Sequence, residues 1–291
     1  SSVGMTHNET SVIPAVGEWR GEPYYYIPYE YELKIGPELL WDGEWAGTLC
    51  PNYSLVAHTV WMAVAYSVVM HAAQKLMENR EPIKLRLPLI LWNAGLALFS
   101  LCGSIRMGEE FFHVLRTRSF LDSVSFAVNI REPAAFWCGA FALSKIFELG
   151  DTVFVVARKK ELIFLHWYHH AVVLVYSFHS SCEAIAGGRW FVFMNYSVHA
   201  VMYTYYALAA ADFRFPKWCS MIVTVLQTSQ MFIGVCISCT VLYVKMNGGL
   251  VQQSWENLLL CFTIYFSFAI LFMNFFIQTY LKKKEKKVKD A

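Results

Sequence analysis

The sequence Phe164-Leu165-His166-Trp167-Tyr168-His169-His170 places three histidines within a long apolar run. In a helix, positions i, i+3 and i+4 lie on one face, so the three imidazoles would share that face. Ionisable side chains inside an apolar transmembrane helix are costly, by about 2.5 to 3.5 kcal/mol each on insertion scales. This stretch therefore predicts a buried site with a chemical role, and the rest of the chain must supply its surroundings.

The composition indicates a membrane protein. Of the 291 residues, 56% are hydrophobic and only 16% are charged, and the mean hydropathy is +0.38. These values are too apolar for a water-soluble domain of this length. The net charge of +2 identifies no acidic or basic partner, and no nucleic-acid-binding module is visible. The eight cysteines show no CxxC pair and no metal-ligand spacing, so we expect most of them to be small core residues.

Long apolar stretches alternate with short charged connections along the chain. Each is close to or above the roughly 20 residues that cross about 30 Å of hydrocarbon. They predict an all-α, polytopic fold with seven transmembrane helices near 53–73, 87–107, 134–157, 161–181, 189–211, 217–243 and 255–280. Residues 108–133 are polar and irregular and are expected to form an interfacial helix in part.

The two ends of the chain are expected to lie outside the membrane. Residues 1–52 contain four prolines that break any long helix, which predicts a loose extramembrane segment. They contain no basic stretch followed by an apolar one, so we expect no cleaved signal peptide and expect the first apolar helix to start insertion. The chain is thus divided into an N-terminal segment, a seven-helix domain over 53–280 and a basic tail over 281–291.

Basic residues gather on one side of the predicted helices. That side is expected to be cytosolic by the positive-inside rule, and it holds Lys75, Arg80, Lys84, Arg86, Arg158, Lys159, Lys160, Arg214, Lys217 and the lysines of the tail. Seven spans then place the N-terminus in the lumen, where the sequon at Asn8 could be glycosylated or be a chance occurrence. Lys287 and Lys289 match a dilysine retrieval signal of endoplasmic-reticulum membrane proteins, or else form a basic patch for anionic lipid.

Four of the predicted spans carry polar side chains on one face. These are Lys145, Glu148 and Asp151, then His166, His169 and His170, then Asn195, His199, Tyr203 and Tyr206, and finally Thr224, Gln227 and Gln230. At 1.5 Å per residue from the nearest cytosolic end, Asp151 lies roughly 10 Å deep, His169 roughly 13 Å, Gln227 roughly 15 Å, and Lys145 and His199 roughly 19 Å. The matching depths predict one polar chamber that opens to the cytosol and continues into an apolar tunnel.

A structural explanation of these polar residues stays open. Lys145 and Glu148 could form a satisfied structural pair, and Gln227 and Gln230 could join helices by hydrogen bonds. His166 could serve only to orient a neighbouring histidine.

Two chemistries compete for the histidines. Clustered histidines can bind metal, as in a membrane desaturase or hydroxylase. However, His166, His169, His170 and His199 are too few for two irons unless carboxylates complete the set, although a single metal with Asp151 stays open. In the other case an imidazole acts as base or nucleophile, and Asp151 fixes a tautomer or stabilises an imidazolium. A polar pocket that continues into an apolar tunnel suits a fatty acyl thioester.

Four segments together resemble a known family. KIFELGDT (145–152), HWYHH (166–170), NYSVHAVMYTYY (195–206) and TVLQTSQ (224–230) are similar, in order and spacing, to the signature boxes of the ELO family of very-long-chain fatty acid elongases. The resemblance covers the chain from about residue 50 to the basic tail.

The resemblance implies a seven-helix 3-ketoacyl-CoA synthase of the endoplasmic-reticulum membrane. Such an enzyme joins acyl-CoA and malonyl-CoA, releases carbon dioxide and CoA, and needs no redox cofactor. Its partners are the reductases and the dehydratase that complete the elongation cycle, and a homo-oligomer stays open. Trp167, Glu161 and Met194 in and near the boxes resemble the branch that handles saturated and monounsaturated chains. A seven-span receptor or proton-coupled transporter is the alternative from another class.

The resemblance also suggests roles for single residues. His169 is expected to carry the acyl group as an acyl-imidazole, helped by His199 and by the adjacent His170, while Asp151 and His166 tune the imidazoles. Substrate would be bound by Lys145, Glu148, Asn195, Tyr203, Tyr206, Gln227 and Gln230, with donors to thioester or enolate oxygens among them. Arg158 and Lys159 are candidates for the CoA phosphates, unless membrane topology alone explains their charge.

One departure from the family concerns a disulfide. Many relatives have a lumenal cysteine after the second span and another before the seventh, where this chain has Ser125 and the region Gly248-Gly249-Leu250. We therefore expect that disulfide to be absent.

Overall fold

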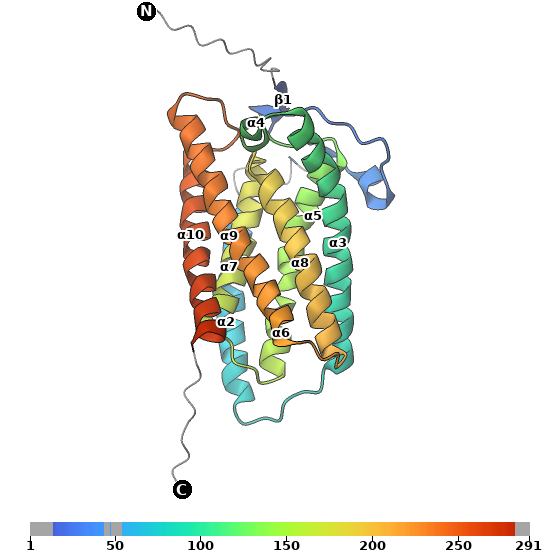
Figure 1. Cartoon of the computed structure of the whole chain (residues 1–291), viewed down its shortest axis with the longest axis vertical. Coiled ribbons are helices and arrows are strands. Elements are labelled where there is room, and N and C mark those ends of the chain that lie inside the picture. Colours follow the sequence, from blue (N-terminus) through green and yellow to red (C-terminus); the bar gives the residue numbers. More distant parts are fainter. Residues whose placement is uncertain (1–13, 44–46, 48–53, 283–291) are drawn as a thin grey trace, which may run out of the picture.

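The protein is an all-helical membrane protein apart from one small hairpin. The computed structural model describes residues 14–43, 47 and 54–282. The long helices are α2 (Ser54–Met77), α3 (Arg86–Thr117), α5 (Pro133–Glu148), α6 (Gly150–Ala157), α7 (Phe164–Glu183), α8 (Gly188–Ala210), α9 (Lys217–Met246) and α10 (Trp255–Phe276), which a short π-helix, η3 (Ile277–Leu281), extends. They stand side by side in one bundle, with β1 and α4 at one end and α6 at the other (Figure 1).

Helices occupy all seven of the predicted spans. Within the described residues, four stretches have the length and the apolar composition needed to cross a membrane: α2, α3, α9 and Trp255–Leu281. The closest partners in the bundle are α3 with α8, α9 with α10, and α2 with α7. Apolar side chains of α7, α8, α9 and α10 form the largest core cluster, which includes Tyr176, Met231, Tyr265 and Phe268.

The third predicted span is divided, so the expectation of one continuous helix over 134–157 is wrong. Leu149 separates α5 from α6, and its N–H bonds to the carbonyl of Ile146 while its own carbonyl accepts from the N–H of Thr152. These tight i to i+3 bonds mark a local 3₁₀-type turn. A Cβ on Gly150 would lie 2.5 Å from the Trp92 ring, so glycine allows α3 to approach the break closely.

The expectation of an irregular segment over 108–133 is also wrong for its first part. α3 continues to Thr117, and α4 (Phe120–Ser125) follows after the capping residue Ser119, whose hydroxyl accepts from the N–H of Asp122. Glu110 has the polarity of a loop residue, but it is only 1% exposed and accepts hydrogen bonds from Arg189. Arg189 compensates the charge of Glu110 inside the fold. The polarity of Glu110 therefore did not mark the end of α3.

The N-terminal segment is ordered where it is described, contrary to the expected loose structure. β1 (Ala15–Trp19) and β2 (Glu22–Tyr26) form an antiparallel hairpin. Its two turn residues, Arg20 and Gly21, have φ values of 57° and 81°, as a type I′ turn requires. Tyr24 and Ile27 are buried against the bundle. Prolines prevent a long helix in this segment, but its aromatic and apolar side chains still hold it on the helix ends.

Glu38 anchors the 3₁₀-helix η1 (Gly36–Leu40) to the bundle. Its carboxylate accepts hydrogen bonds from Arg106 Nε and Nη2 at 2.7 and 2.8 Å, from Trp137 Nε1 at 2.7 Å and from the Ile35 N–H at 2.9 Å. Burial raises the pKa of Glu38, but the hydrogen bonds from Arg106, Ile35 and Trp137 outweigh it and hold the pKa below the ordinary value of 4.5. The ionised form therefore stabilises the attachment of this segment.

We expect acid to loosen the N-terminal segment through Glu38. A carboxyl with a depressed pKa contributes stability above its unfolded-state pKa of about 4.3, and this contribution is lost as the pH falls through the folded-state pKa. Hydrogen exchange of the amides of residues 27–40 should thus be steady between about pH 7 and 5, after correction for intrinsic rates, and accelerate below about pH 4. Glu38→Gln should exchange faster at neutral pH and lose the acid step, whereas Glu32→Gln, at an exposed position, should behave like the wild type. An acid step that persists in Glu38→Gln would contradict this assignment.

Candidate active site

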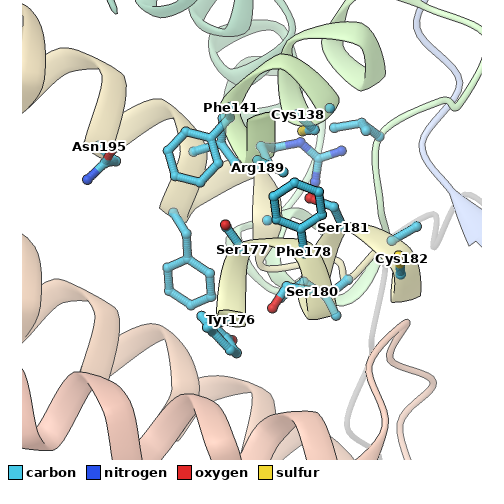
Figure 2. Close-up of a pocket in the computed structure, with 18 of the residues that line it drawn as sticks. Cys138, Phe141, Tyr176, Ser177, Phe178, Ser180, Ser181, Cys182, Arg189 and Asn195 are labelled. Atoms are coloured by element: carbon cyan, nitrogen blue, oxygen red, sulfur yellow. The ribbon is translucent and has the colours of Figure 1, made fainter. Parts of the chain in front are cut away.

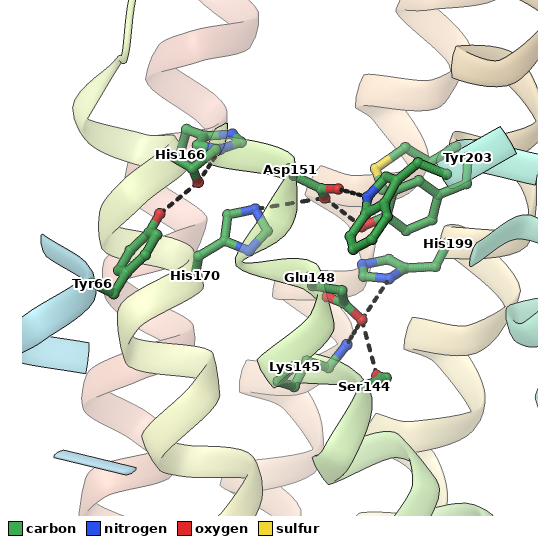
Figure 3. Close-up of polar contacts among 12 residues, drawn as sticks. Tyr66, Ser144, Lys145, Glu148, Asp151, His166, His170, His199 and Tyr203 are labelled. Carbon is green, nitrogen blue, oxygen red and sulfur yellow. Dashed lines mark hydrogen bonds and ion pairs between the residues drawn. The ribbon is translucent and has the colours of Figure 1, made fainter. Parts of the chain in front are cut away.

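Polar side chains of three of the predicted stripes, those on α5 and α6, on α7 and on α8, meet inside the bundle (Figure 3). They form two groups. One surrounds Glu148 and His199, and the other surrounds Asp151 and the histidines of α7. The rings of His199 and Tyr203, with centroids 5.3 Å apart, connect the two groups.

Glu148 is the centre of the first group. Its Oε1 accepts from Lys145 Nζ at 2.7 Å and from the Ser144 hydroxyl at 3.0 Å, and lies 3.7 Å from His199 Nδ1. Lys145 Nζ also donates to Asn195 Oδ1 at 3.0 Å, while Asn195 Nδ2 is 3.3 Å from His199 Nε2. The Nε2 of His199 is thus hydrogen-bonded to Asn195 of its own helix, while its Nδ1 faces the Glu148 carboxylate of α5.

Asp151 is the centre of the second group. Its two carboxylate oxygens accept from Trp92 Nε1 at 2.7 Å and from the Tyr203 hydroxyl at 2.6 Å. His170 Nε2 lies 4.0 Å from Asp151 Oδ2, so His170 is the imidazole nearest to this carboxylate. Asp151 follows the break at Leu149, so it does not continue the helical spacing of Lys145 and Glu148 on α5. The break therefore sets the direction of the Asp151 side chain.

His166 is oriented by hydroxyl groups. Its Nε2 lies 2.9 Å from the Thr152 hydroxyl, which in turn is 2.7 Å from the Tyr66 hydroxyl of α2. The rings of His166 and His170 have centroids 4.6 Å apart. His166 thus supports the histidine face from the side of α2.

His169 differs from the other three histidines of the site. Its ring lies against Phe268 of α10, with centroids 4.9 Å apart, and lines an internal cavity. Within the described residues no hydrogen bond engages either ring nitrogen. A neutral imidazole in this position presents an unengaged lone pair to whatever occupies the cavity.

The cavity has a volume of about 620 Å³, and Figure 2 shows part of its lining, with Phe141, Tyr176 and Phe178 among the labelled side chains. Along α7 its lining extends from His169 to Cys182, a distance of roughly 20 Å at 1.5 Å per residue. Its wall is mainly apolar, with side chains from α5, α7, α8, α9 and α10, while Asn195 and Gln230 are polar members. Its shape and lining suit a long apolar chain with a polar head near His169.

The remaining predicted site residues lie in different environments. Gln230 is 5% exposed and lines the cavity, whereas Gln227 Nε2 donates to Met202 Sδ at 3.0 Å. Tyr206 is 41% exposed beside the ring of Tyr203. Arg158 and Lys159 are exposed just after α6, where Lys159 Nζ donates to the carbonyl of Glu78. Asn8, Lys287 and Lys289 lie outside the described residues.

Four partners in the site were missed by the sequence reasoning. They are Tyr66, Trp92, Ser144 and Thr152. Trp92 and Tyr66 lie in apolar helices where an aromatic residue gives no sign of a polar role. Ser144 and Thr152 are adjacent to Lys145 and Asp151, so their position next to buried charges was the available signal.

The described residues contain no group of three or more His, Cys, Asp or Glu side chains placed to hold a metal ion. Of the cysteines, Cys182 at the end of α7 is disulfide-bonded. The loops that would carry the family disulfide are joined here by a backbone hydrogen bond of 2.8 Å, from the N–H of Gln252 to the carbonyl of Ser125.

Comparison with known proteins gives consistent matches. The sequence profile of the ELO (GNS1/SUR4) family matches residues 52–288. A Caenorhabditis elegans protein that bears a fatty acid elongase name is 45% identical over 264 residues, which is 90% of this chain and 90% of its own length. Very long chain fatty acid elongase 6 of Homo sapiens is 41% identical over 225 residues, covering 77% and 84%. Very long chain fatty acid elongase 3 of Homo sapiens is 39% identical over 262 residues, covering 90% and 93%.

Proposed function

The chain belongs to the ELO family and is a condensing enzyme of fatty acid elongation, and from this premise we propose that it joins a long-chain acyl-CoA to malonyl-CoA through an acyl-imidazole on His169. The products are a 3-ketoacyl-CoA two carbons longer, carbon dioxide and CoA. The observation that carries this proposal is the place of His169, whose ring lies where the polar groups of the site meet a long apolar cavity.

The proposed reaction has two halves. In the first, a His169 ring nitrogen attacks the thioester carbonyl, the C–S bond breaks and CoA leaves as its thiol after taking up a proton. In the second, malonyl-CoA loses carbon dioxide, and the resulting carbanion attacks the acyl-imidazole carbonyl. A C–C bond forms, the C–N bond breaks and the imidazole is regenerated. The sequence of steps is ping-pong and needs no redox cofactor.

The neighbouring groups support these steps by position. His199, held between Glu148 and Asn195, is placed to assist the acyl transfer or to share the carrier role. Amide groups of Asn195 and Gln230 line the cavity and are candidates to donate to the thioester or enolate oxygen. His170 Nε2 lies 4.0 Å from Asp151 Oδ2, and a carboxylate near an imidazole stabilises its charged form.

The length of the cavity fits a long acyl chain. Its extent along α7 is roughly 20 Å, whereas one lipid tail spans about half of the ~30 Å hydrocarbon core. The cavity therefore has room for a chain at least as long as the tails of ordinary membrane lipids. Trp167, Glu161 and Met194 resemble the family branch that handles saturated and monounsaturated chains. This resemblance supports a saturated or monounsaturated acyl chain as substrate.

We further propose that the seven helical segments cross the membrane of the endoplasmic reticulum, with the N-terminus in the lumen and the C-terminus in the cytosol. The basic connections support this orientation. The disulfide of Cys182 also supports it, because disulfides persist in an oxidising compartment and this residue lies at the end of α7 assigned to the lumen. Arg158 and Lys159 would then face cytosolic CoA, and the tail lysines would serve retrieval.

Further partners follow from the reaction class. A 3-ketoacyl-CoA must be reduced, dehydrated and reduced again before another cycle, so reductases and a dehydratase are expected beside this enzyme. The alternatives of a metal-dependent desaturase and of a receptor or transporter gain no support from the comparisons.

Extension of an acyl-CoA by purified protein tests the proposal. We expect one carbon dioxide and one CoA to be released for each 3-ketoacyl-CoA formed, only with malonyl-CoA present and without added reductant. Loss of this activity on removal of stoichiometric iron or zinc from active protein would replace acyl-imidazole chemistry by metal chemistry. No extension of any acyl-CoA by folded protein would reject the proposed reaction.

A further inference from the structure

We propose that the N-terminal β-hairpin, together with Trp41, forms the floor of the acyl cavity and limits the length of the chain that the enzyme extends. The cavity is lined by Trp19 and Tyr24 of the hairpin and by Trp41. Along α7 the cavity extends from His169 to Cys182, and these three rings lie at the end away from His169. This inference rests on the proposed function, because it treats the cavity as the acyl site.

The hairpin is attached firmly enough to act as a floor. Trp19 Nε1 and Arg20 Nη1 both donate to the carbonyl of Cys182, at 2.9 and 3.2 Å. The Tyr24 hydroxyl donates to the carbonyl of Val128, and Tyr24 is 1% exposed. The hairpin thus spans from the end of α7 to the loop after α4.

Backbone hydrogen bonds fix the second strand of the hairpin. The N–H of Ile27 donates to the Ala127 carbonyl at 3.1 Å, and the N–H of Ala127 donates to the Tyr25 carbonyl at 3.0 Å. The N–H of Tyr25 donates to Gln252 Oε1 at 3.2 Å. Two segments that are distant in sequence, at Ala127 and at Gln252, therefore hold β2, and a chain end that reached Tyr24 would meet a fixed surface.

Trp41 completes the floor from a second direction. Its Nε1 donates to the Ile130 carbonyl at 2.8 Å. Its ring lies on α5, where a Cβ on Gly139 would be 3.3 Å from the ring. The absence of a side chain at Gly139 lets this ring reach the cavity wall.

Among the described residues, the charged side chain that lines this end of the cavity offers no hydrogen-bond donor to a bound chain. Arg189 lines this end of the cavity, but its guanidinium N–H groups bond to Glu110 and to the carbonyls of Ser123, Phe126 and Ala127. The rings of Trp19, Tyr24 and Trp41 are what an entering chain would contact. The chemistry of the floor thus fits an apolar methyl end.

Opening the floor should lengthen the accepted chain. Trp19→Ala removes the ring while Arg20 still binds the Cys182 carbonyl, and Trp41→Ala opens the other side. For the first acyl-CoA two carbons beyond the wild-type limit, we expect kcat/KM to rise by about 15-fold, the factor for burying two further methylene groups. Shorter substrates should be extended as by the wild type.

Filling the cavity should shorten the accepted chain in a graded way. Ser177 and Ser181 line the cavity one turn apart on α7. Ser181→Phe should lower the length limit, and Ser177→Phe should lower it further, by a chain segment of about 6 Å, which is the rise of four helical residues. These variants leave the hairpin contacts intact, so an unchanged length limit in folded Ser181→Phe would overturn the assignment even if Trp19→Ala or Trp41→Ala fails to fold.

Two matched controls separate length selection from stability. Val16→Ala changes an exposed residue of the same hairpin, and Trp61→Ala removes an exposed tryptophan ring from α2. Both should keep the wild-type length profile. The measurement is kcat/KM over a series of acyl-CoA lengths, with thermal midpoints of all variants.

The outcomes distinguish this inference from the proposed function. If the wild type extends acyl-CoA but the folded floor variants and the two phenylalanine variants keep its length limit, the floor assignment is overturned. A uniform fall in activity at all lengths would also overturn it, because it indicates a merely structural hairpin. If the wild type extends no acyl-CoA at all, the proposed reaction itself fails.

Discussion

Replacing His169 by alanine is expected to lower elongation turnover by about 10⁴-fold or more and to abolish an acyl adduct that forms on the wild type with acyl-CoA alone. The physical reason is that His169 is the histidine of the α7 cluster whose ring lines the apolar cavity. His166 and His170 are engaged instead with Thr152 and Asp151. A nucleophile must approach the thioester carbonyl directly, and only a group on the cavity wall can do so without rearrangement.

Intact-mass analysis and peptide mapping measure this adduct. His58→Ala is the control, because His58 is an exposed residue near the start of α2 whose Nδ1 contacts the Ser54 carbonyl. It should keep both turnover and adduct. Normal turnover of the wild type without any adduct would contradict the covalent mechanism, and an adduct that survives in His169→Ala would move the carrier role to another histidine, with His199 the first to map.

Replacing Arg189 by methionine is expected to destabilise the protein by about 3 to 5 kcal/mol. Arg189 and Glu110 form an ion pair of 2.7 Å whose side chains are 0% and 2% exposed. The substitution would leave the Glu110 carboxylate buried without its donors. It would also remove the donors from three backbone carbonyls at the end of the bundle near the hairpin.

The thermal midpoint of the detergent-solubilised protein measures this loss, which should be roughly 10 °C. The double variant Glu110→Gln with Arg189→Met should recover a large part, because it leaves no unpaired buried charge. Arg86→Met is the matched control, since the Arg86–Asp212 pair has side chains that are 61% and 74% exposed and should contribute no more than about 1 kcal/mol. An effect of Arg189→Met as small as that of Arg86→Met would show that the buried pair does not stabilise the fold.

Local sequence patterns predicted the bounds of a helix well where a long, mainly apolar run lies between charged or glycine-rich connections. The fifth span was expected over 189–211, and α8 covers Gly188–Ala210. The same patterns failed at the extension of α3 to Thr117 and at the break before Gly150. In both places the contact comes from a residue distant in sequence: Arg189 binds Glu110, and the Trp92 ring lies close to Gly150.

Residues of different helices could be placed together by depth because every helix rises by the same 1.5 Å per residue. Lys145 and His199 were expected at one depth, and the structure links both to Glu148 and Asn195. The depth of a residue does not show, however, which way its side chain faces around the helix axis. It did not distinguish Gln230, which lines the cavity, from Gln227, which contacts Met202.

The sequence by itself determined that this is a helical membrane protein with histidines, carboxylates and amides inside its apolar spans, because segment length, apolar periodicity and the cost of burying polar groups are local properties. Only the tertiary structure decided which carboxylate accompanies which imidazole, which histidine lines the cavity, and that a hairpin expected to be loose lies at the end of that cavity. These features depend on contacts such as the one between Trp19 and Cys182, which are 163 residues apart. The geometry of such a pair follows from how the whole bundle packs, and no local pattern contains it.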